Sequence, residues 1–584
     1  MAGLFDTFSI AKRGLQVNQS LINTTSHNIA NADTDGYSRQ RSVVATTTPS
    51  GGNSKFDTCT VGQVGTGSQI IAIQRIRDTF IDARVRNQMS ENGSLDAQDT
   101  YMGQVENIVN ETSDTGVQKA LSDFYTSFSS LTQGSANTSN KTVAIGKATT
   151  LASKISNRYD SLETIKTGIQ SQLKSDVTSV NQTLDDINTL NDQIKKISTL
   201  GLTPNDLMDK RDNLLDTLST ELGITVTSGK DNSVSVTANE NGGGALGSSD
   251  TLVNATDSTT SITSKRFSYY DSSTYDGTST LTVKYYKLGD SSNPTTISVT
   301  GVNSQAEADL LKADLEKNRI LVTNNNGDFT TPASSTILEG DFKKAIYSNT
   351  EKGKIGGLQT IQGNVQTSID DLNTVAKSLA YTVNAIQVGG TTAAQVTASG
   401  LASSELIFVK NGTTSDDDIS AANITVNSAL DYSKLNCGKN SSSGDGDGTR
   451  ASAISNISSL KIDYTKSGVA SATSRADFFT AAVISPTTTD YSSLTSSTTG
   501  STITNYYISA LNKLDTKGSA ISNDLSAAEI SLKDIENQRT SASGVSTDEE
   551  TTNLIEYNHA YQANAKVIST INDLLNVVIN GLGV

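Results

Sequence analysis

The chain has 584 residues, more than one hydrophobic core usually holds, so we expect three or four domains. Apolar residues make up about 40% of the chain when glycine is counted and tyrosine is left out, below the 45–50% usual for globular domains. Polar residues, chiefly Ser, Thr and Asn, take their place. The formal net charge is -16 and basic stripes are absent, which argues against nucleic acid as a partner.

The sequence also bears on membrane insertion and redox chemistry. It contains no apolar run of about 18 residues or more, so we expect no membrane insertion. The opening segment, MAGLFDTFSIAKRGL, lacks a charged start followed by an apolar block, so it is not expected to act as a secretory signal peptide. Cys59 and Cys437 could form one bridge, although two free thiols are favoured.

The first predicted helix runs to about residue 30 and carries a seam. The seam residues recur at alternating steps of four and three, which keeps one stripe facing a partner helix, as in a coiled coil. They are Leu4, Phe8, Ala11, Leu15, Asn18, Ile22, Thr25 and Ile29. The polar run 31–36 ends this helix, and an extended stretch with alternation at 69–73 follows to about residue 74.

The next segment, residues 75–222, is predicted to be almost wholly helical. Its longest helix covers about 151–198, where apolar residues recur near the helical period. Gly201 and Pro204 end that helix, and a shorter amphipathic helix follows over residues 205–222.

Beyond Gly223 the period changes to that of strands. Alternating residues predict strands at 224–226, 234–236, 281–286 and 297–299, with a loop at 241–244. A helix is predicted over 354–388. Residues 389–500 are rich in Ser, Thr and Gly and have a mixed pattern, with a mobile loop expected at 440–448.

The C-terminal part is helical again. An amphipathic pattern covers 502–543, and after a break at 541–545 the last helix carries a second seam. The seam residues are Leu554, Tyr557, Tyr561, Asn564, Ile568, Ile571, Leu575, Val578 and Leu582. Its polar member Asn564 and the first seam's Asn18 can specify register at a cost in stability.

Three acids stand at the start of the last helix. Asp548, Glu549 and Glu550 complement the positive end of the helix dipole. Ser546 or Thr547 can cap the helix, and Thr547 with Glu550 has the spacing of a capping box. We therefore interpret these acids as structural.

The expected fold class is mainly α with β-rich insertions, elongated and multi-domain, with the terminal helices paired. Residues 1–55 and 545–584 would form a terminal helical domain. A helical rod domain would contain 56–230, 340–390 and 500–544. The outer parts would be a β-rich domain at 231–339 and a variable mixed insertion at 391–499.

Motifs that carry chemistry are weak in this chain. His27 and His559 lie on the terminal helices, and no GxSxG or HExxH pattern is present. The glycines at 242–244 lack the residues of a phosphate-binding loop. The acids at 416–418 and 444–448 lack the ligand spacing of an EF-hand, and zinc would need more Cys and His. We predict no catalytic residue, no cofactor and no metal.

Residues 27–40, HNIANADTDGYSRQ, resemble the N-terminal motif of the bacterial flagellar axial protein family, and residues 544–575 resemble its C-terminal motif. The N-terminal matches are Asn28, Ile29, Ala30, Asn31, Thr34, Gly36 and Tyr37. The C-terminal matches are Gly544, Val545, Asp548, Glu549, Glu550, Tyr561, Gln562, Ala563, Asn564 and Ala565. Residues 205–222 and 355–384 resemble the hook-associated branch of that family.

The resemblance implies a structural protein at the junction between flagellar hook and filament. It implies a ring-like homo-oligomer whose terminal helices line an inner tube, with the hook protein and a second junction protein as neighbours. It also implies export by the flagellar type III apparatus, with an export chaperone on the C-terminal helix. The two seams would then supply the subunit interface.

Three other classes stay open. A hook or other axial protein shares both terminal motifs and differs in the helix at 205–222. A secreted Ser/Thr-rich adhesin would explain the middle of the chain and not the paired seams. An enzymatic activity placed in the variable insertions is the third, because fold does not fix function.

Overall fold

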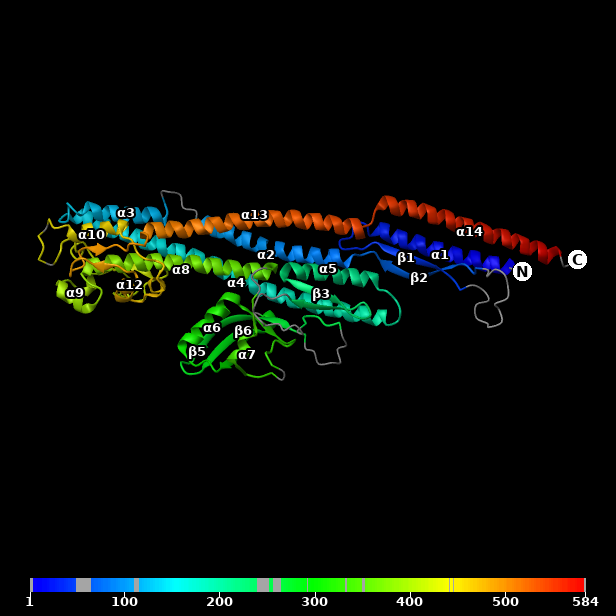
Figure 1. Cartoon of the computed structure of the whole chain (residues 1–584), viewed down its shortest axis with the longest axis horizontal. Coiled ribbons are helices and arrows are strands. Elements are labelled where there is room, and N and C mark those ends of the chain that lie inside the picture. The colour runs from blue at the N-terminus through cyan, green and yellow to red at the C-terminus, as the bar shows by residue number, and fades with distance from the viewer. Residues whose placement is uncertain are drawn as a thin grey trace. The chain divides into compact units, whose positions relative to one another are not determined.

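The computed structural model describes residues 4–48, 65–109, 115–238, 251–255, 264–290, 292–330, 333–348, 352–440, 442–444 and 446–581. Helices dominate, with β-sheets inserted between them (Figure 1). The predicted mainly α class with β-rich insertions is therefore confirmed. The chain forms two compact units, one of residues 1–94, 174–356 and 526–584 and one of residues 95–173 and 357–525. The domain boundaries drawn from sequence stay a prediction.

The two terminal helices lie side by side in the first unit (Figure 1). They are α1 (Leu4–Ala30) and α14 (Thr547–Gly581). They run antiparallel, because Asn28 near the end of α1 contacts Glu550 at the start of α14. Asn31 ends α1 by donating its side-chain N–H to the His27 carbonyl at 2.9 Å. An antiparallel hairpin of β1 (Gln40–Thr46) and β2 (Ser68–Arg75) packs against α1.

The predicted helical segment after this hairpin contains four helices. They are α2 (Thr79–Val109), α3 (Val117–Ser130), α4 (Thr138–Ser198) and α5 (Asn205–Glu221). The long helix α4 begins well before the predicted residue 151. Its first turns bury Ala144 and Ala148 completely. The sequence prediction relied on large apolar side chains and missed these turns, because alanine packs closely while burying little apolar area.

The β-rich insertion is a six-stranded sheet in the order β10-β8-β5-β6-β7-β9, antiparallel except for the β7–β9 pair. Its strands are β5 (Arg266–Tyr275), β6 (Thr280–Tyr286), β7 (Pro294–Thr300), β8 (Ile320–Thr323), β9 (Thr336–Leu338) and β10 (Ile346–Tyr347). The helices α6 (Gln305–Asn318) and α7 (Glu339–Lys343) accompany it, and α6 was not predicted. Ser304 caps α6, which buries Ala308, Leu311 and Leu315 in the core of the sheet. A separate hairpin joins β3 (Ile224–Ser228) and β4 (Val234–Ala238).

The predicted mixed segment lies in the second unit and consists of short elements. It follows α8 (Gly353–Val388) and precedes α13 (Ile503–Ser543). The elements are α9 (Ala393–Ser399), β11 (Phe408–Lys410), β12 (Ile424–Val426), α10 (Thr449–Asn456), α11 (Ser467–Ser471), α12 (Arg475–Ala481), β13 (Ser485–Pro486) and β14 (Leu494–Thr495). The buried Arg450 binds two backbone carbonyls, those of Ile386 and Lys439.

The segments considered for ligand binding have local structural roles where they are described. Asp416 is buried and accepts from Arg475 Nε at 3.0 Å and from Asn384 Nδ2 at 2.9 Å. Asp447 accepts from the Lys439 and Thr449 backbone N–H groups, so it joins the two ends of this acidic segment, in which residues 441 and 445 lie outside the described residues. Cys437 is a buried free thiol. Cys59 and the glycines at 242–244 lie outside the described residues.

A buried carboxyl at the end of α5 sets up a pH dependence. Burial and the charge of Asp176 raise the pKa of Glu221 from 4.5 to about 7, while Lys354, 3.9 Å away, lowers it. The folded protein therefore keeps a proton that the unfolded chain releases between these pH values. The associated stability is present below pH 4.5 and is lost as pH rises through 7.

We expect Glu221→Gln to raise the free energy of unfolding by about 1–3 kcal/mol at pH 8 and to change it little at pH 4.5. The amide is neutral at both pH values, so it removes the cost of the buried charge. Urea unfolding at the two pH values measures the difference. An equal effect at both would contradict the assigned titration.

Candidate functional site

The seam residues of α1 and α14 face one another within this chain. On α1, Ala11 and Thr25 are buried and Phe8, Leu15, Ile22 and Ile29 are half-buried. On α14, Ile571 is only 4% exposed, and Leu554, Tyr557, Tyr561, Ile568 and Leu575 are half-buried. The side chain of Leu4 and all of Leu582 lie outside the described residues. Whether these residues also form a subunit interface stays a prediction.

The two seam asparagines bond within their own helices. Asn18 Nδ2 donates to the Gly14 carbonyl at 2.8 Å, and Asn564 Nδ2 donates to the Ala560 carbonyl at 2.9 Å. Gly14 faces Asn564 so closely that a Cβ at position 14 would lie 2.7 Å from Asn564 Oδ1. The register of α1 against α14 is therefore favoured by the small Gly14 opposite the Asn564 amide. The polarity of the two seam asparagines, which the sequence indicated, also favours it.

A second apolar stripe on α14 lies outside the seam. We call it the outer stripe. It consists of Val567, Leu574, Val577 and Val578, whose exposed fractions are 41%, 49%, 69% and 48%. Val578 was predicted as a seam residue and lies two turns from the buried Ile571, but it is exposed and borders both the seam and the outer stripe. The spacing of seven between Val567 and Leu574 returns to the same side of a helix after two turns.

The N-terminal motif is held by a buried amide. Asn28 is 1% exposed, and its Oδ1 accepts from the Tyr37 hydroxyl at 2.8 Å and the Gln40 backbone N–H at 3.0 Å. Its Nδ2 donates to the Gln40 carbonyl at 2.9 Å and to Glu550 Oε2 at 3.1 Å. One side chain thus fixes the end of α1, the start of β1 and the start of α14.

The acids at the start of α14 divide their roles. Glu550 is 3% exposed and accepts from Arg39 Nε at 2.7 Å, whereas the exposed Glu549 accepts from Arg39 Nη1 at 3.1 Å. Ser546 caps the helix through the Glu549 N–H. The carboxylate of Glu550 binds Asn28 of α1 and Arg39 just before β1, so the Thr547–Glu550 capping box predicted from sequence does not describe its role. Glu549 and Glu550 thus hold the start of α14 to Arg39 and Asn28, while the structural interpretation of all three acids stays a prediction.

The sequence motif at residues 205–222, on α5, contacts the same segment that follows Asn28. Asp209 accepts from the Ser38 hydroxyl at 2.8 Å and from Arg75 Nη1 at 2.6 Å. Asp206 accepts from Gln40 Nε2 at 3.0 Å. Segments that were singled out separately in the sequence, near residues 28–40, 205–216 and 548–550, therefore meet in one polar junction.

Behind this junction lies an Arg–Asp cluster, which we define as Arg75, Arg77, Arg86, Arg211, Arg539, Asp82, Asp209, Asp212 and Asp216. Burial alone would raise the pKa of Asp212, but the charges of Arg77, Arg75, Arg211 and Arg86 outweigh it and lower that pKa. A buried carboxylate among several cations stays ionised.

The aromatic and glycine residues of the N-terminal motif complete the junction. Burial, followed by the charges of Asp206, Asp209 and Glu550, raises the pKa of Tyr37, so its hydroxyl keeps its proton and donates to Asn28. Gly36 turns the chain with φ +71°. A Cβ there would lie 1.8 Å from Oδ1 of Asn213, whose Nδ2 donates to the Asp35 carbonyl.

We expect Gly36→Ala to lower the free energy of unfolding by about 2–4 kcal/mol, because it combines left-handed strain with a clash. Gly277→Ala is the matched control. Gly277 also has positive φ, +80°, and no heavy atom of the described residues lies within 4 Å of its would-be Cβ. The control should cost only the strain, about 1–2 kcal/mol. If urea unfolding gave equal losses of free energy for Gly36→Ala and Gly277→Ala, the Asn213 side chain would move aside without cost.

The arginines of the cluster were missed from sequence. Arg75 and Arg77 stand in the run QRIRD at the end of β2, and Arg86 follows on α2. Basic residues at a strand end, together with the acids of DLMDKRDNLLD, offered a signal of charge complementarity. The pairing needs the fold, because the partners are more than 100 residues apart.

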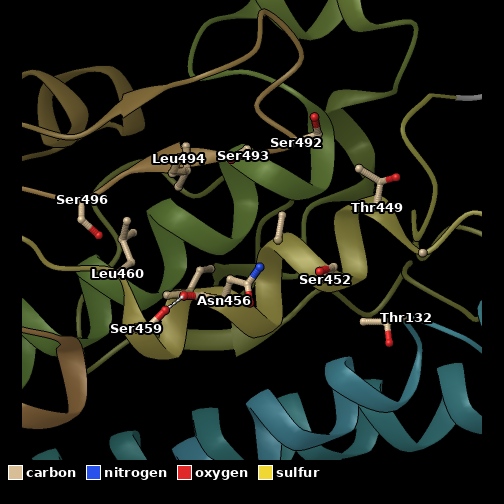
Figure 2. A pocket seen from close by; sticks show the side chains of 13 residues that line it. Thr132, Thr449, Ser452, Asn456, Ser459, Leu460, Ser492, Ser493, Leu494 and Ser496 are labelled. Atoms are coloured by element: carbon tan, nitrogen blue, oxygen red, sulfur yellow. Dashed lines mark hydrogen bonds between the residues drawn. The ribbon is translucent and has the colours of Figure 1, made fainter.

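The second unit holds a hydroxyl-lined cavity of about 690 Å³ (Figure 2). Figure 2 shows Ser459 donating to the Asn456 carbonyl beside it. The residues that line the cavity are Thr132, Gly448, Thr449, Ser452, Ala453, Asn456, Ile457, Ser459, Leu460, Ser492, Ser493, Leu494 and Ser496. None of these side chains titrates near neutral pH, so the cavity offers no pair for general acid–base catalysis.

The described residues offer neither a metal-binding cluster nor a membrane-spanning helix. They contain no group of three or more His, Cys, Asp or Glu side chains placed to hold a metal ion. Within the same residues, no helix has both the length and the apolar character needed to cross a bilayer.

Comparison with known families matches both ends and the middle of the chain. Residues 102–304 match the flagellar hook-associated protein FlgK helical domain. Residues 536–581 match the flagellar basal body rod FlgEFG protein C-terminal family, and residues 8–37 match the flagella basal body rod protein family. The matched ends include most of α1, all of α14 and the acids that meet Asn28 and Arg39.

Individual relatives agree with these family matches. The flagellar hook-associated protein 1 of Bacillus subtilis (strain 168) is 28% identical over 595 residues, 100% of this chain and 99% of that protein. The Salmonella typhimurium protein of the same name is 28% identical over 219 residues, 37% of this chain and 38% of that protein. The solved flagellar hook junction protein FlgK from Burkholderia pseudomallei has a TM-score of 0.37 at 19% identity, over 56% of this chain and 47% of that one, too low to support an argument.

Paired terminal helices joined by these motifs define an axial structural protein of the bacterial flagellum. The match of residues 102–304 to the FlgK helical domain favours the hook-associated members of this class. The chain is similar over its whole length to the flagellar hook-associated protein 1 of Bacillus subtilis, and its helical domain matches the FlgK helical domain family.

Proposed function

We propose that this protein joins the flagellar hook to the filament and that its subunits associate through the terminal helices. The observation that carries the proposal is the outer stripe. Four apolar side chains on α14 are at least 41% exposed, although α1 already covers the seam beside them. An exposed apolar stripe of this kind marks an interaction surface.

In this proposal the seam and the outer stripe have different roles. The seam joins α1 to α14 within one subunit, and the outer stripe contacts the neighbouring subunit in a ring-like layer. A lone subunit leaves the stripe in water, so the apolar side chains of the outer stripe stay unburied until assembly. Packing into the layer supplies the missing contacts.

The remaining partners and the route of export belong to the same proposal. The hook protein and a second junction protein are the axial neighbours. The flagellar type III apparatus exports the chain, and an export chaperone covers the C-terminal helix before assembly. The exposed apolar residues of α14 support this last step, because they would favour aggregation if they were left bare at high concentration.

A deletion strain tests the proposed role. Negative-stain electron microscopy of its hooks and a blot of the medium for flagellin give the readout. The proposal expects bare hooks and flagellin lost to the medium. Full filaments would refute it, and loss of hooks altogether would favour the hook or rod protein interpretation.

A further inference from the structure

A group of exposed apolar side chains outside α14 lies on the β1–β2 hairpin and on the loop beside it. Val44, Ile71 and Ile73 belong to the hairpin, and Leu200 and Leu202 belong to the loop between α4 and α5. All five side chains are at least 38% exposed among the described residues. We call these five residues the hairpin patch.

The two parts of the hairpin patch are held together at the start of α5. Asn205 Nδ2 donates to the Ile73 carbonyl at 3.1 Å, and Asn205 is buried. Leu202 stands three residues before Asn205, so the chain places it within about 11 Å of that contact. Val44 lies across the hairpin from the bulge at Ile71. The patch is therefore one region of the surface and not a scatter of single side chains.

The fold of one chain leaves this patch uncovered. The hairpin contacts α1, where the hydroxyl oxygens of Thr24 and Ser42 lie 2.8 Å apart. That contact buries Ser42 and leaves the side chains of the hairpin patch in water. Single exposed apolar residues are ordinary on a protein surface, but a group of them marks an interaction surface.

A ring of identical subunits needs two different contact surfaces on each subunit. If the outer stripe of α14 met its own copy, the contact would close into a two-fold pair, whereas a ring repeats one head-to-tail contact. The outer stripe therefore needs a different apolar surface on its neighbour. Within one chain, the outer stripe and the hairpin patch both stay exposed, so both are available to another copy.

The two surfaces are similar in length. The outer stripe from Val567 to Val578 is about 17 Å long at 1.5 Å per residue. The strand from Ile71 to Ile73 covers about 7 Å, and the loop that carries Leu202 continues the patch beyond it by up to about 11 Å. One α14 helix can therefore lie along the whole patch.

The charges beside the two surfaces are also compatible. On α14, Lys566 and Asp573 are exposed and stand next to members of the outer stripe. Beside the hairpin patch, Arg41 on β1 and Asp206 on α5 are exposed. Both signs occur on both sides, so a neighbour can meet each charge with an opposite one.

We propose that the outer stripe of one subunit packs on the hairpin patch of the next copy of this chain. The inference rests on the proposed assembly through the terminal helices, and it assigns the surface that receives α14. Each subunit then offers α14 to one neighbour and its hairpin to the other.

A photoreactive amino acid at Ile71 tests the contact in assembled flagella. Cross-linked dimers of the full chain would be digested with trypsin and sequenced by mass spectrometry. Residues 567–584 contain no Lys or Arg, so one peptide carries the whole outer stripe after cleavage at Lys566. We expect position 71 to be joined to this peptide, and a probe at Leu338 on β9 to give no such product.

The same experiment separates this contact from the proposed function. If a probe at Leu574 joins neighbouring chains while position 71 reaches no residue of 567–584, the hairpin patch is the wrong surface and assembly through α14 stands. Dimers that join 567–584 to itself would likewise overturn the patch. If neither probe joins two chains, the proposed assembly fails together with this contact.

A matched pair of variants gives a second readout. Ile71 is 59% exposed, so Ile71→Asp should unfold in urea as the natural chain does. It should lower the fraction of cells with filaments at least about tenfold, because a charge enters an apolar contact. Leu338→Asp, at a 63% exposed position, should stay within about twofold of the natural strain. Equal filament counts for the two variants would contradict the contact.

Discussion

Replacing Asp212 with alanine is expected to lower the free energy of unfolding by about 3–5 kcal/mol. Its side chain is about one-tenth exposed and lies 2.8 Å from Arg75 Nη1 and 3.4 Å from Arg77 Nη1. Removing it leaves these buried cations without their shared anion. Urea unfolding at pH 7 measures the loss. Asp206→Asn is the control, because the side chain of Asp206 is 65% exposed and should cost under 1 kcal/mol.

The same substitution has a predicted pH dependence. The pKa of Asp212 is lowered below its usual 3.8, since the arginines outweigh the effect of burial. Stability from this carboxylate is therefore present above pH 3.8 and is lost as pH falls through the lower, folded-state pKa. The difference in Tm between the natural chain and Asp212→Ala should be largest at neutral pH and shrink as the pH falls below 3.8. A constant difference across this range would show that packing, and not charge, is what alanine removes.

Two aspartate substitutions on α14, three residues apart, should fail in different ways. Ile571 is 4% exposed against α1, so Ile571→Asp buries a charge and should destabilise the terminal pair by at least about 3 kcal/mol. Leu574 is 49% exposed on the outer stripe, so Leu574→Asp should leave the isolated protein as stable as the natural chain. Circular dichroism during urea unfolding separates the two.

Assembly should fail in both variants. For Leu574→Asp we expect at least a tenfold drop in cells that carry filaments, because a charge replaces an apolar contact between subunits. Leu310→Asp is the control, since Leu310 on α6 is 73% exposed and lies outside the terminal helices. Normal swimming of the Leu574→Asp strain would sink the assigned role of the outer stripe.

Sequence periodicity predicted the helical frame well because large apolar residues mark one side of each long helix. It placed α1 and α8 close to their observed bounds. It failed where small residues do the packing, as with Ala144 and Ala148 in α4. It also missed α6, whose polar surface hides a narrow apolar side of Ala308, Leu311 and Leu315.

The polar junction was only half predictable. Motif resemblance singled out Asn28, Tyr37 and Glu550, and these do meet. The pairing of Arg39 with Glu550, and of Arg75 with Asp209, could not be found, because contacts between residues so far apart in the chain depend on tertiary structure. The sequence also could not separate the seam from the outer stripe, because a heptad pattern does not tell which side of α14 is covered by α1.

Photo-cross-linking at Leu574 tests the central claim most directly. A photoreactive amino acid placed there in an otherwise natural chain, and a second strain with it at Leu310, would be irradiated in assembled flagella and as purified subunits. The account predicts cross-linked dimers of this chain from position 574 in flagella only, and none from position 310. Subunits that stay uncross-linked at 574 in intact flagella would contradict assembly through the outer stripe.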